Sequence, residues 1–271
     1  LSWTANSGGG AIDGLSDAKL GGTDFTNSII IGHQTTGTLD AAERNTAVGI
    51  GSLDAITSGD RNTAIGHKAL TSNTTGSDNT ASGDYSLYAN TTGGKNTASG
   101  EYSLFGNSLG NYNTASGYYS LSNNTTGNYN TASGSNSLQQ NTTGGSNTAS
   151  GYASLNANTT GGSNTALGYT AGDVITTGSN NVLIGKGADP SANNATNQIV
   201  IGASAVGAGD NTVQLGNTDI TNVKTSGTIT AGAITIPNTD GSANQILKTD
   251  GSGSLSWTAN SGGGAIDGLS D

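Results

Sequence analysis

Glycine recurs along this chain at a constant interval of 17 residues. A repeat this regular is typical of architectures in which each unit packs mainly against its two neighbours. Numbering each repeat from its glycine as position 1 gives the consensus G-x-x-S-L-x-x-N-T-T-G-x-x-N-T-A-x. The series has eleven members without an insertion: Gly32, Gly49, Gly66, Gly83, Gly100, Gly117, Gly134, Gly151, Gly168, Gly185 and Gly202.

The consensus excludes a helix and favours short strands. Each repeat carries two glycines, asparagine and β-branched threonine, all poor helix formers. The N-T-A-x and Y-S-L segments predict two strands per coil. Turns are expected at N-T-T-G and at the first glycine, because Gly and Asn accept positive φ. We therefore expect an all-β fold, a β-solenoid (β-roll) of 17-residue coils that stacks like residues in ladders.

Alternation along the strand sorts the side chains into inner and outer sets. Position 16 is mostly Ala and position 17 is Ile, Val, Leu or Ser. Neighbouring strand residues point to opposite faces, so Ala is expected inside with the position-5 leucines, and position 17 outside. The predicted roll core is Leu53, Leu70, Leu87, Leu104, Leu121, Leu138 and Leu155. The apolar position-17 residues predicted to face partner chains are Ile31, Val48, Ile65, Leu167, Ile184 and Ile201.

Such a thin coil has little to stabilise it alone. Burial of one Leu contributes about 2–3 kcal/mol, whereas ordering 17 residues costs on the order of 20 kcal/mol. This deficit predicts that further surface is buried between chains. We expect a parallel homotrimer around a common axis, with position 17 facing that axis.

A second, longer repeat encloses the first. Residues 1–17 and 255–271 are identical, which indicates a tandem unit of 254 residues; a duplicated linker flanking one domain is the alternative. Trp3 and Trp257 are then equivalent anchors where two units join. The expected segments are a junction at 1–26, the solenoid at 27–216, a β-strand connector at 217–254 and the next unit's start at 255–271.

The repeat resembles the head repeats of trimeric autotransporter adhesins and of related trimeric phage tail fibres. The resemblance rests on runs such as Asn62-Thr63-Ala64-Ile65-Gly66, continued by Ala69-Leu70 and Asn73-Thr74-Thr75-Gly76, and covers about residues 27–216. Residues 241–257 also resemble a connector of many surface and tail fibres. These families imply trimeric β-rolls with roles in adhesion. Their best-known heads use a 14-residue coil, a length found here only in the last step, from Gly202 to Gly216.

Composition limits the partners. The net charge is −10 without a basic stripe, which argues against nucleic-acid binding. Cysteine is absent, so disulfides and thiolate metal sites are excluded. No membrane-spanning segment is expected in this stretch. The expected partners are further copies of the chain, with a host-surface glycan or receptor as a further possibility.

Few residues suggest chemistry of their own. His33 and His67 could share a metal ion, although solvated surface histidines are the simpler interpretation, and we expect no cofactor. Tyr102, Tyr118 and Tyr119 are candidates for glycan contact, with packing between coils or chains as the favoured alternative. Asn-Thr-Thr matches the N-glycosylation sequon, but its fixed place in the repeat favours a turn role. Threonine ladders resembling an ice-binding face are disfavoured.

These observations leave three hypotheses. The first is a structural subunit of an extracellular, cell-surface filament that serves attachment. The second is the shaft of a phage tail fibre with a role in receptor binding. The third, an enzyme built on a β-helix, is disfavoured because the sequence shows no acid/base constellation.

Overall fold

The computed structural model describes residues 18–22, 25–31, 42–220, 245–249 and 255–259. The chain divides into two units, Leu1–Thr221 and Asn222–Asp271. Every regular element among the described residues is a strand. The strands are β1 (Ala18–Gly22), β2 (Phe25–Ile31), β3 (Thr46–Val48), β4 (Thr63–Ile65), β5 (Thr80–Ser82), β6 (Thr97–Ser99), β7 (Thr114–Ser116), β8 (Thr131–Ser133), β9 (Thr148–Ser150), β10 (Thr165–Leu167), β11 (Val182–Ile184), β12 (Ile199–Ile201), β13 (Val213–Leu215), β14 (Gln245–Thr249) and β15 (Leu255–Ala259).

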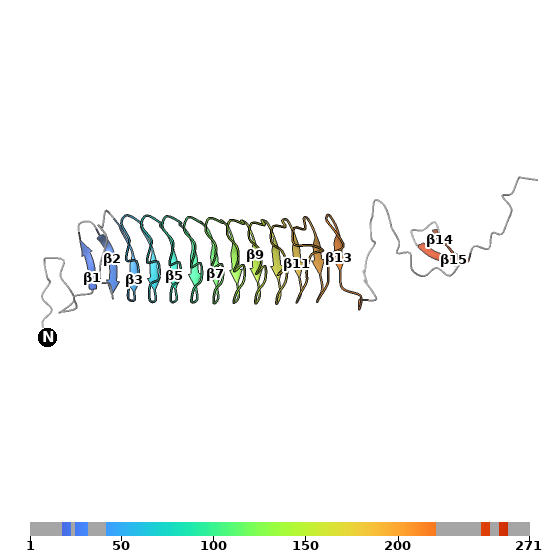
Figure 1. Ribbon diagram of the computed structural model, residues 1–271, viewed down its shortest axis with the longest axis horizontal. Coiled ribbons are helices and arrows are strands. Elements are labelled where there is room, and N and C mark those ends of the chain that lie inside the picture. Colours follow the sequence, from blue (N-terminus) through green and yellow to red (C-terminus); the bar gives the residue numbers. More distant parts are fainter. Residues whose placement is uncertain (1–17, 23–24, 32–41, 221–244, 250–254, 260–271) are drawn as a thin grey trace, which may run out of the picture. The chain divides into compact units, whose positions relative to one another are not determined.

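The first thirteen strands form one sheet in sequence order (Figure 1). From β2 onward each strand pairs in parallel with the next, and β1 pairs antiparallel with β2. Strands β3 to β12 begin every 17 residues, and β13 follows after a step of 14. The predicted all-β solenoid of 17-residue coils is therefore confirmed. Its sheet includes β1, which lies within the stretch that the sequence assigns to the junction.

Each coil contains one strand rather than the two expected. The Y-S-L segment is a tight turn in which the position-5 leucines adopt φ of 49–52°. The preceding serine stabilises this turn, since the hydroxyl of Ser86 donates to the carbonyl of Gly83 at 2.8 Å. The leucine amide still bonds the next coil, from Leu70 N to the oxygen of Ser86. The backbone hydrogen bonds between coils are thus kept although this segment is not a strand.

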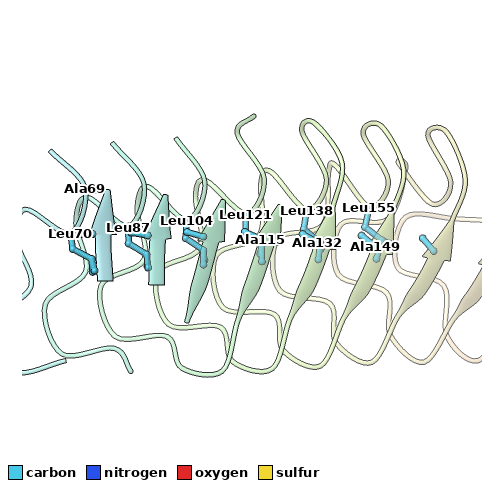
Figure 2. Packing of buried hydrophobic residues seen from close by; sticks show 14 of the residues in the cluster. Ala69, Leu70, Leu87, Leu104, Ala115, Leu121, Ala132, Leu138, Ala149 and Leu155 are labelled. Atoms are coloured by element: carbon cyan, nitrogen blue, oxygen red, sulfur yellow. The ribbon is translucent and has the colours of Figure 1, made fainter. Parts of the chain in front are cut away.

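Leucine and alanine fill the interior in two continuous rows (Figure 2). The strand alanines, such as Ala115 and Ala132, are fully buried opposite the turn leucines. All seven leucines expected in the core have no exposed surface: Leu53, Leu70, Leu87, Leu104, Leu121, Leu138 and Leu155.

Two asparagine ladders complete the interior. At position 8, the amide of Asn124 donates to Asn107 Oδ1 at 2.7 Å and to the carbonyl of Gly127 at 3.0 Å. At position 14, the backbone and side-chain N–H groups of Asn113 both donate to Asn96 Oδ1. Because buried polar groups are nearly always hydrogen-bonded, the amides within each ladder pair with those of the neighbouring coils. At positions 8 and 14 asparagine therefore serves the interior rather than the positive-φ corner that we predicted. Other asparagines do adopt positive φ, namely Asn136, Asn180, Asn197 and Asn211.

The repeat glycine is required by conformation and by space. Gly117 has φ of +137°, and a Cβ atom there would lie 2.6 Å from the carbonyl carbon and oxygen of Gly134. The N-T-T-G glycine is different, because its requirement is space alone. A Cβ on Gly93 would lie 2.4 Å from Asn90 Oδ1 and 2.5 Å from the oxygen of Gly110. Gly32, the first of the series, lies outside the described residues.

The second unit contains a hairpin. β14 and β15 pair antiparallel, with Leu247 opposite Trp257. Of the β-strand connector expected at 217–254, residues 221–244 and 250–254 lie outside the described residues, as does Trp3.

Candidate functional site

The outward side of the parallel strands, which we call the strand face, is a regular surface that runs along the solenoid. It is formed by positions 15 and 17 of strands β3–β13, because the residue between them points inward. The parallel register places like over like, with Thr97 opposite Thr114 and Ser99 opposite Ser116. The middle strands β5–β9 thus present two straight rows of hydroxyl groups.

The strand face is apolar at both ends and polar in the middle. Ile65 in β4 is 48% exposed and Leu167 in β10 is 51% exposed, with the serines of β5–β9 between them. Val48 and Ile201 are also exposed, and Ile184 is partly exposed. Ile31 stands opposite Val48 in the sheet, and its side chain is not among those described. Exposed aliphatic side chains that gather in one place often mark a surface that binds another molecule.

Charge is absent from strands β3–β13 and is found on the loops instead. At position 13, Arg61 Nε donates to Asp78 Oδ1 at 2.6 Å across one coil step. The hydrogen bond from Arg61 lowers the pKa of the Asp78 carboxyl group, and the same bond raises the pKa of Arg61. Such exposed pairs contribute little to stability. Their placement leaves the strand face uncharged.

The tyrosines form stacked columns along the coils. Tyr102 stacks between Tyr85 and Tyr119 with ring centroids 5.2 and 4.7 Å apart, beside a second stack of Tyr88 on Phe105 at 5.2 Å. The faces of these rings cover one another, so few remain open to stack on a sugar. Tyr118 meets Tyr119 edge-on and is itself exposed. The geometry supports packing between coils as the role of Tyr102 and Tyr119.

The sequon asparagines lie inside the roll. Asn73 and Asn90 are fully buried, and the Asn90 amide donates to Asn73 Oδ1 at 2.7 Å. A glycan attached to either nitrogen would require this ladder to open. Sequence reasoning placed these residues at a turn and did not recognise that they point inward. Their fixed position in six successive coils was the available signal.

A pair of carboxylates interrupts the regular core near the C-terminal end of the stack. Asp189 occupies position 5, where earlier coils have leucine, and Asp173 lies in the preceding coil. Burial, reinforced by the neighbouring Asp173 carboxylate, raises the pKa of Asp189 to about 6. Burial also raises the pKa of Asp173. Among residues 42–220, Asp189 Oδ1 and Asn158 Oδ1 are the buried side-chain oxygens without a hydrogen-bond partner.

Of the two histidines that could share a metal ion, His33 lies outside the described residues. His67 is partly exposed and packs edge-on against Tyr85 at 5.1 Å. Within the described part of the chain, no three His, Cys, Asp or Glu side chains gather in a way that could hold a metal ion. The same residues include no helix with the length and apolar character needed to cross a membrane.

Comparison with known proteins identifies no family. No family model, curated protein or solved structure matches this chain. The strand face and the tyrosine columns are therefore interpreted from their geometry.

Proposed function

We propose that this chain is a structural subunit of an extracellular, cell-surface fibre, in which three parallel copies pack through their strand faces. The observation that carries the proposal is the strand face itself, which is uncharged and carries exposed aliphatic residues at both ends. The fibre would serve attachment, and its tandem units would extend it.

The distribution of residues suits a contact between identical copies. Depletion of charge and enrichment of apolar side chains distinguish the core of a protein interface from ordinary surface. With parallel copies around one axis, each apolar end meets the same end of its neighbours, as cyclic symmetry requires. The threonine and serine side chains of β5–β9 are small enough to let the strand faces of neighbouring copies approach closely between the apolar ends. The apolar ends would then fix the register of the copies.

The number of copies rests on a separate argument. The thin interior, with one leucine and one alanine per coil, leaves much of each coil exposed in a single chain. Three copies around an axis bury one face of each coil, and the coil resembles repeats of trimeric adhesins. No catalytic role is proposed. The alternative, a tail-fibre shaft, would use the same packing of three copies but would belong to a phage rather than to a cell surface.

Subunit mass tests the proposal directly. Light scattering should give three times the chain mass of 26.5 kDa. Leu167→Asp places a charge on the strand face and should shift the protein toward monomer, because a buried unpaired charge is costly. Leu109→Asp is the matched control, since Leu109 is 50% exposed but lies on a loop outside the strands.

The control variant should keep the mass of the wild type. Where Leu167→Asp lowers folding as well as assembly, circular dichroism at rising protein concentration should show recovery of the strand signal, as mass action requires. A folded wild-type monomer, or equal effects of the two substitutions, would contradict the proposal.

A further inference from the structure

We infer that Tyr112 and Tyr129 form an oxidative cross-linking site, at which a one-electron oxidant joins two successive coils of one chain through a dityrosine bond. The two side chains occupy position 13 of adjacent coils, immediately before the buried asparagines that precede β7 and β8. Their ring centroids lie 5.0 Å apart and their planes differ by 14°. No assembly of chains is needed for this proximity, because the pair is intramolecular.

Exposure separates this pair from the stacked tyrosines of the middle coils. Tyr112 is 46% exposed and Tyr129 is 62% exposed. One other stacked pair, Tyr152 and Tyr169 with ring centroids 5.2 Å apart, is exposed to a similar degree, at 49% and 53%. Tyr85, Tyr102 and Tyr119 are only partly exposed, and Phe105 packs beside Tyr85 and Tyr102. An oxidant in solution reaches the first pair more readily. Exposed rings also have the freedom to tilt, which brings the ring carbons beside the two hydroxyl groups together.

Neighbouring side chains hold one ring and leave the other free. Lys95 Nζ donates to the hydroxyl of Tyr112 at 2.7 Å and lies 4.7 Å from the centre of its ring. On the other side of the pair, the next coil has the small Ser146 at the same position. Tyr112 is therefore anchored, whereas Tyr129 has room to move toward it.

Composition leaves the aromatic side chains, nine tyrosines and two tryptophans, as the groups most readily oxidised. The chain has no cysteine and no methionine, the two side chains that ordinarily react first with oxidants, but it has nine tyrosines. Oxidising equivalents are thus not diverted to sulfur. A phenol whose neighbour in the stack is another phenol then has a partner for radical coupling.

The reaction balances with a haem peroxidase and hydrogen peroxide as oxidant. Each phenol loses one electron and one proton to give a tyrosyl radical. The radicals combine through a carbon–carbon bond between positions ortho to the hydroxyl groups, and each ring regains aromaticity as the ortho hydrogen moves to the oxygen. Two hydrogen atoms leave the pair in total, and they reduce one hydrogen peroxide to two water molecules.

The test is peroxidase treatment of the folded chain, followed by proteolysis and mass spectrometry that locates the linked residues. We expect a Tyr112–Tyr129 link, two hydrogen atoms lighter than the unlinked residues, without a change in the single-chain band on a denaturing gel. The similarly stacked and exposed pair Tyr152 and Tyr169 is the other link expected. Tyr129→Phe keeps the stacked ring but removes the coupling hydroxyl, and the link should disappear. Tyr88→Phe is the matched control and should retain it.

The same treatment in denaturant provides the second comparison. Links in the unfolded chain should be spread over many tyrosine pairs, because the stacking is lost. An equal Tyr112–Tyr129 yield in folded and unfolded chains would overturn the inference. So would a preference in the folded chain for pairs other than Tyr112–Tyr129 and Tyr152–Tyr169. The outcome is independent of the fibre proposal, since the bond forms within one chain and subunit mass is read separately.

Discussion

The middle coils and the C-terminal coils of the solenoid fill the same cross-section in different ways. In the middle coils the turn supplies leucine and the strand supplies alanine, as in the pair Leu121 and Ala132. Toward the C-terminal end the sizes are exchanged. Gly172 takes the leucine position, and Leu183 takes the alanine position in β11.

The exchange keeps the interior filled. A Cβ on Gly172 would lie 2.5 Å from Leu183 Cδ1 and 3.0 Å from Leu155 Cδ2, so the strand leucine occupies the space that the turn leucine has vacated. Protein interiors are packed at near-crystalline density, and swaps that conserve volume are tolerated best. The stack is therefore constrained by total volume per coil rather than by a residue type at each position.

The asparagine ladder marks the same boundary. It runs from Asn73 to Asn158 at position 8, and Ile56 and Ile175 occupy that position in the adjoining coils. Because the Ile175 side chain has no N–H group, Asn158 Oδ1 is left without a partner, whereas the Oδ1 atoms within the ladder accept from the amide of the next coil. Hydrogen bonds are therefore satisfied within the ladder, and the free-energy cost of an unpaired buried oxygen falls on its last coil.

Interrupting the ladder in the middle should give the largest effect. Asn124→Ile would leave Asn107 Oδ1 and one N–H group of Asn141 unpaired, and each buried unpaired group costs about 1–3 kcal/mol. The free energy of unfolding, measured with denaturant, should fall by roughly 2–6 kcal/mol. Asn158→Ile is the matched variant. It moves the ladder end by one coil without adding an unpaired oxygen, and a loss as large as that of Asn124→Ile would contradict this account.

Restoring a large side chain at Gly172 while Leu183 is kept should have an intermediate effect on the free energy of unfolding. Gly172→Leu overfills the coil and should cost about 1–3 kcal/mol. The added substitution Leu183→Ala recreates the pair of the middle coils and should recover much of this loss. A double-mutant cycle measured by denaturant unfolding should then give a coupling energy of about 0.5–3 kcal/mol. Additive effects would show that the two side chains do not share one volume.

Lowering the pH should have the smallest effect on stability, and the effect should come from the C-terminal coils. The pKa of Asp189 is raised to about 6 in the fold, above its ordinary value of 3.8. The fold therefore prefers the protonated acid: the penalty is fully present above pH 6 and is relieved as the pH falls from about 6 to about 4. Melting temperature should rise over that window. Asp189→Asn should flatten the rise and exceed the wild type near pH 7.5, and an unchanged pH profile in this variant would rule out Asp189 as its source.

Much of the architecture followed from the spacing of a few residue types. The step from Gly32 to Gly202 predicted the stack, its coil length and its all-β class. Alternation around the strand predicted that Ala115 and its equivalents point inward and that the serine and isoleucine row points outward. The strand face could be found in this way because its pattern changes from Ile65 to serine and back to Leu167 along the chain.

Other features could not be read from the pattern. Leucine rarely adopts positive φ, so the Y-S-L segment was predicted to be a strand rather than a turn. Only the folded coil shows that Ser86 ties this segment into a turn and that Leu87 still bonds the next coil. The inward direction of Asn73 and the stacking of Tyr112 on Tyr129 likewise depend on which corner each residue occupies.

The sequence by itself determined the repeat, because stacking at a fixed coil length requires every coil to place glycine at the same close approach between backbones. The tertiary structure alone decided which polar residues are inside. A buried amide is favourable only when the next coil supplies its hydrogen-bond partner, and that partner lies 17 residues away. The same reason applies to Gly172 and Leu183, whose sizes have meaning only when the coils are stacked.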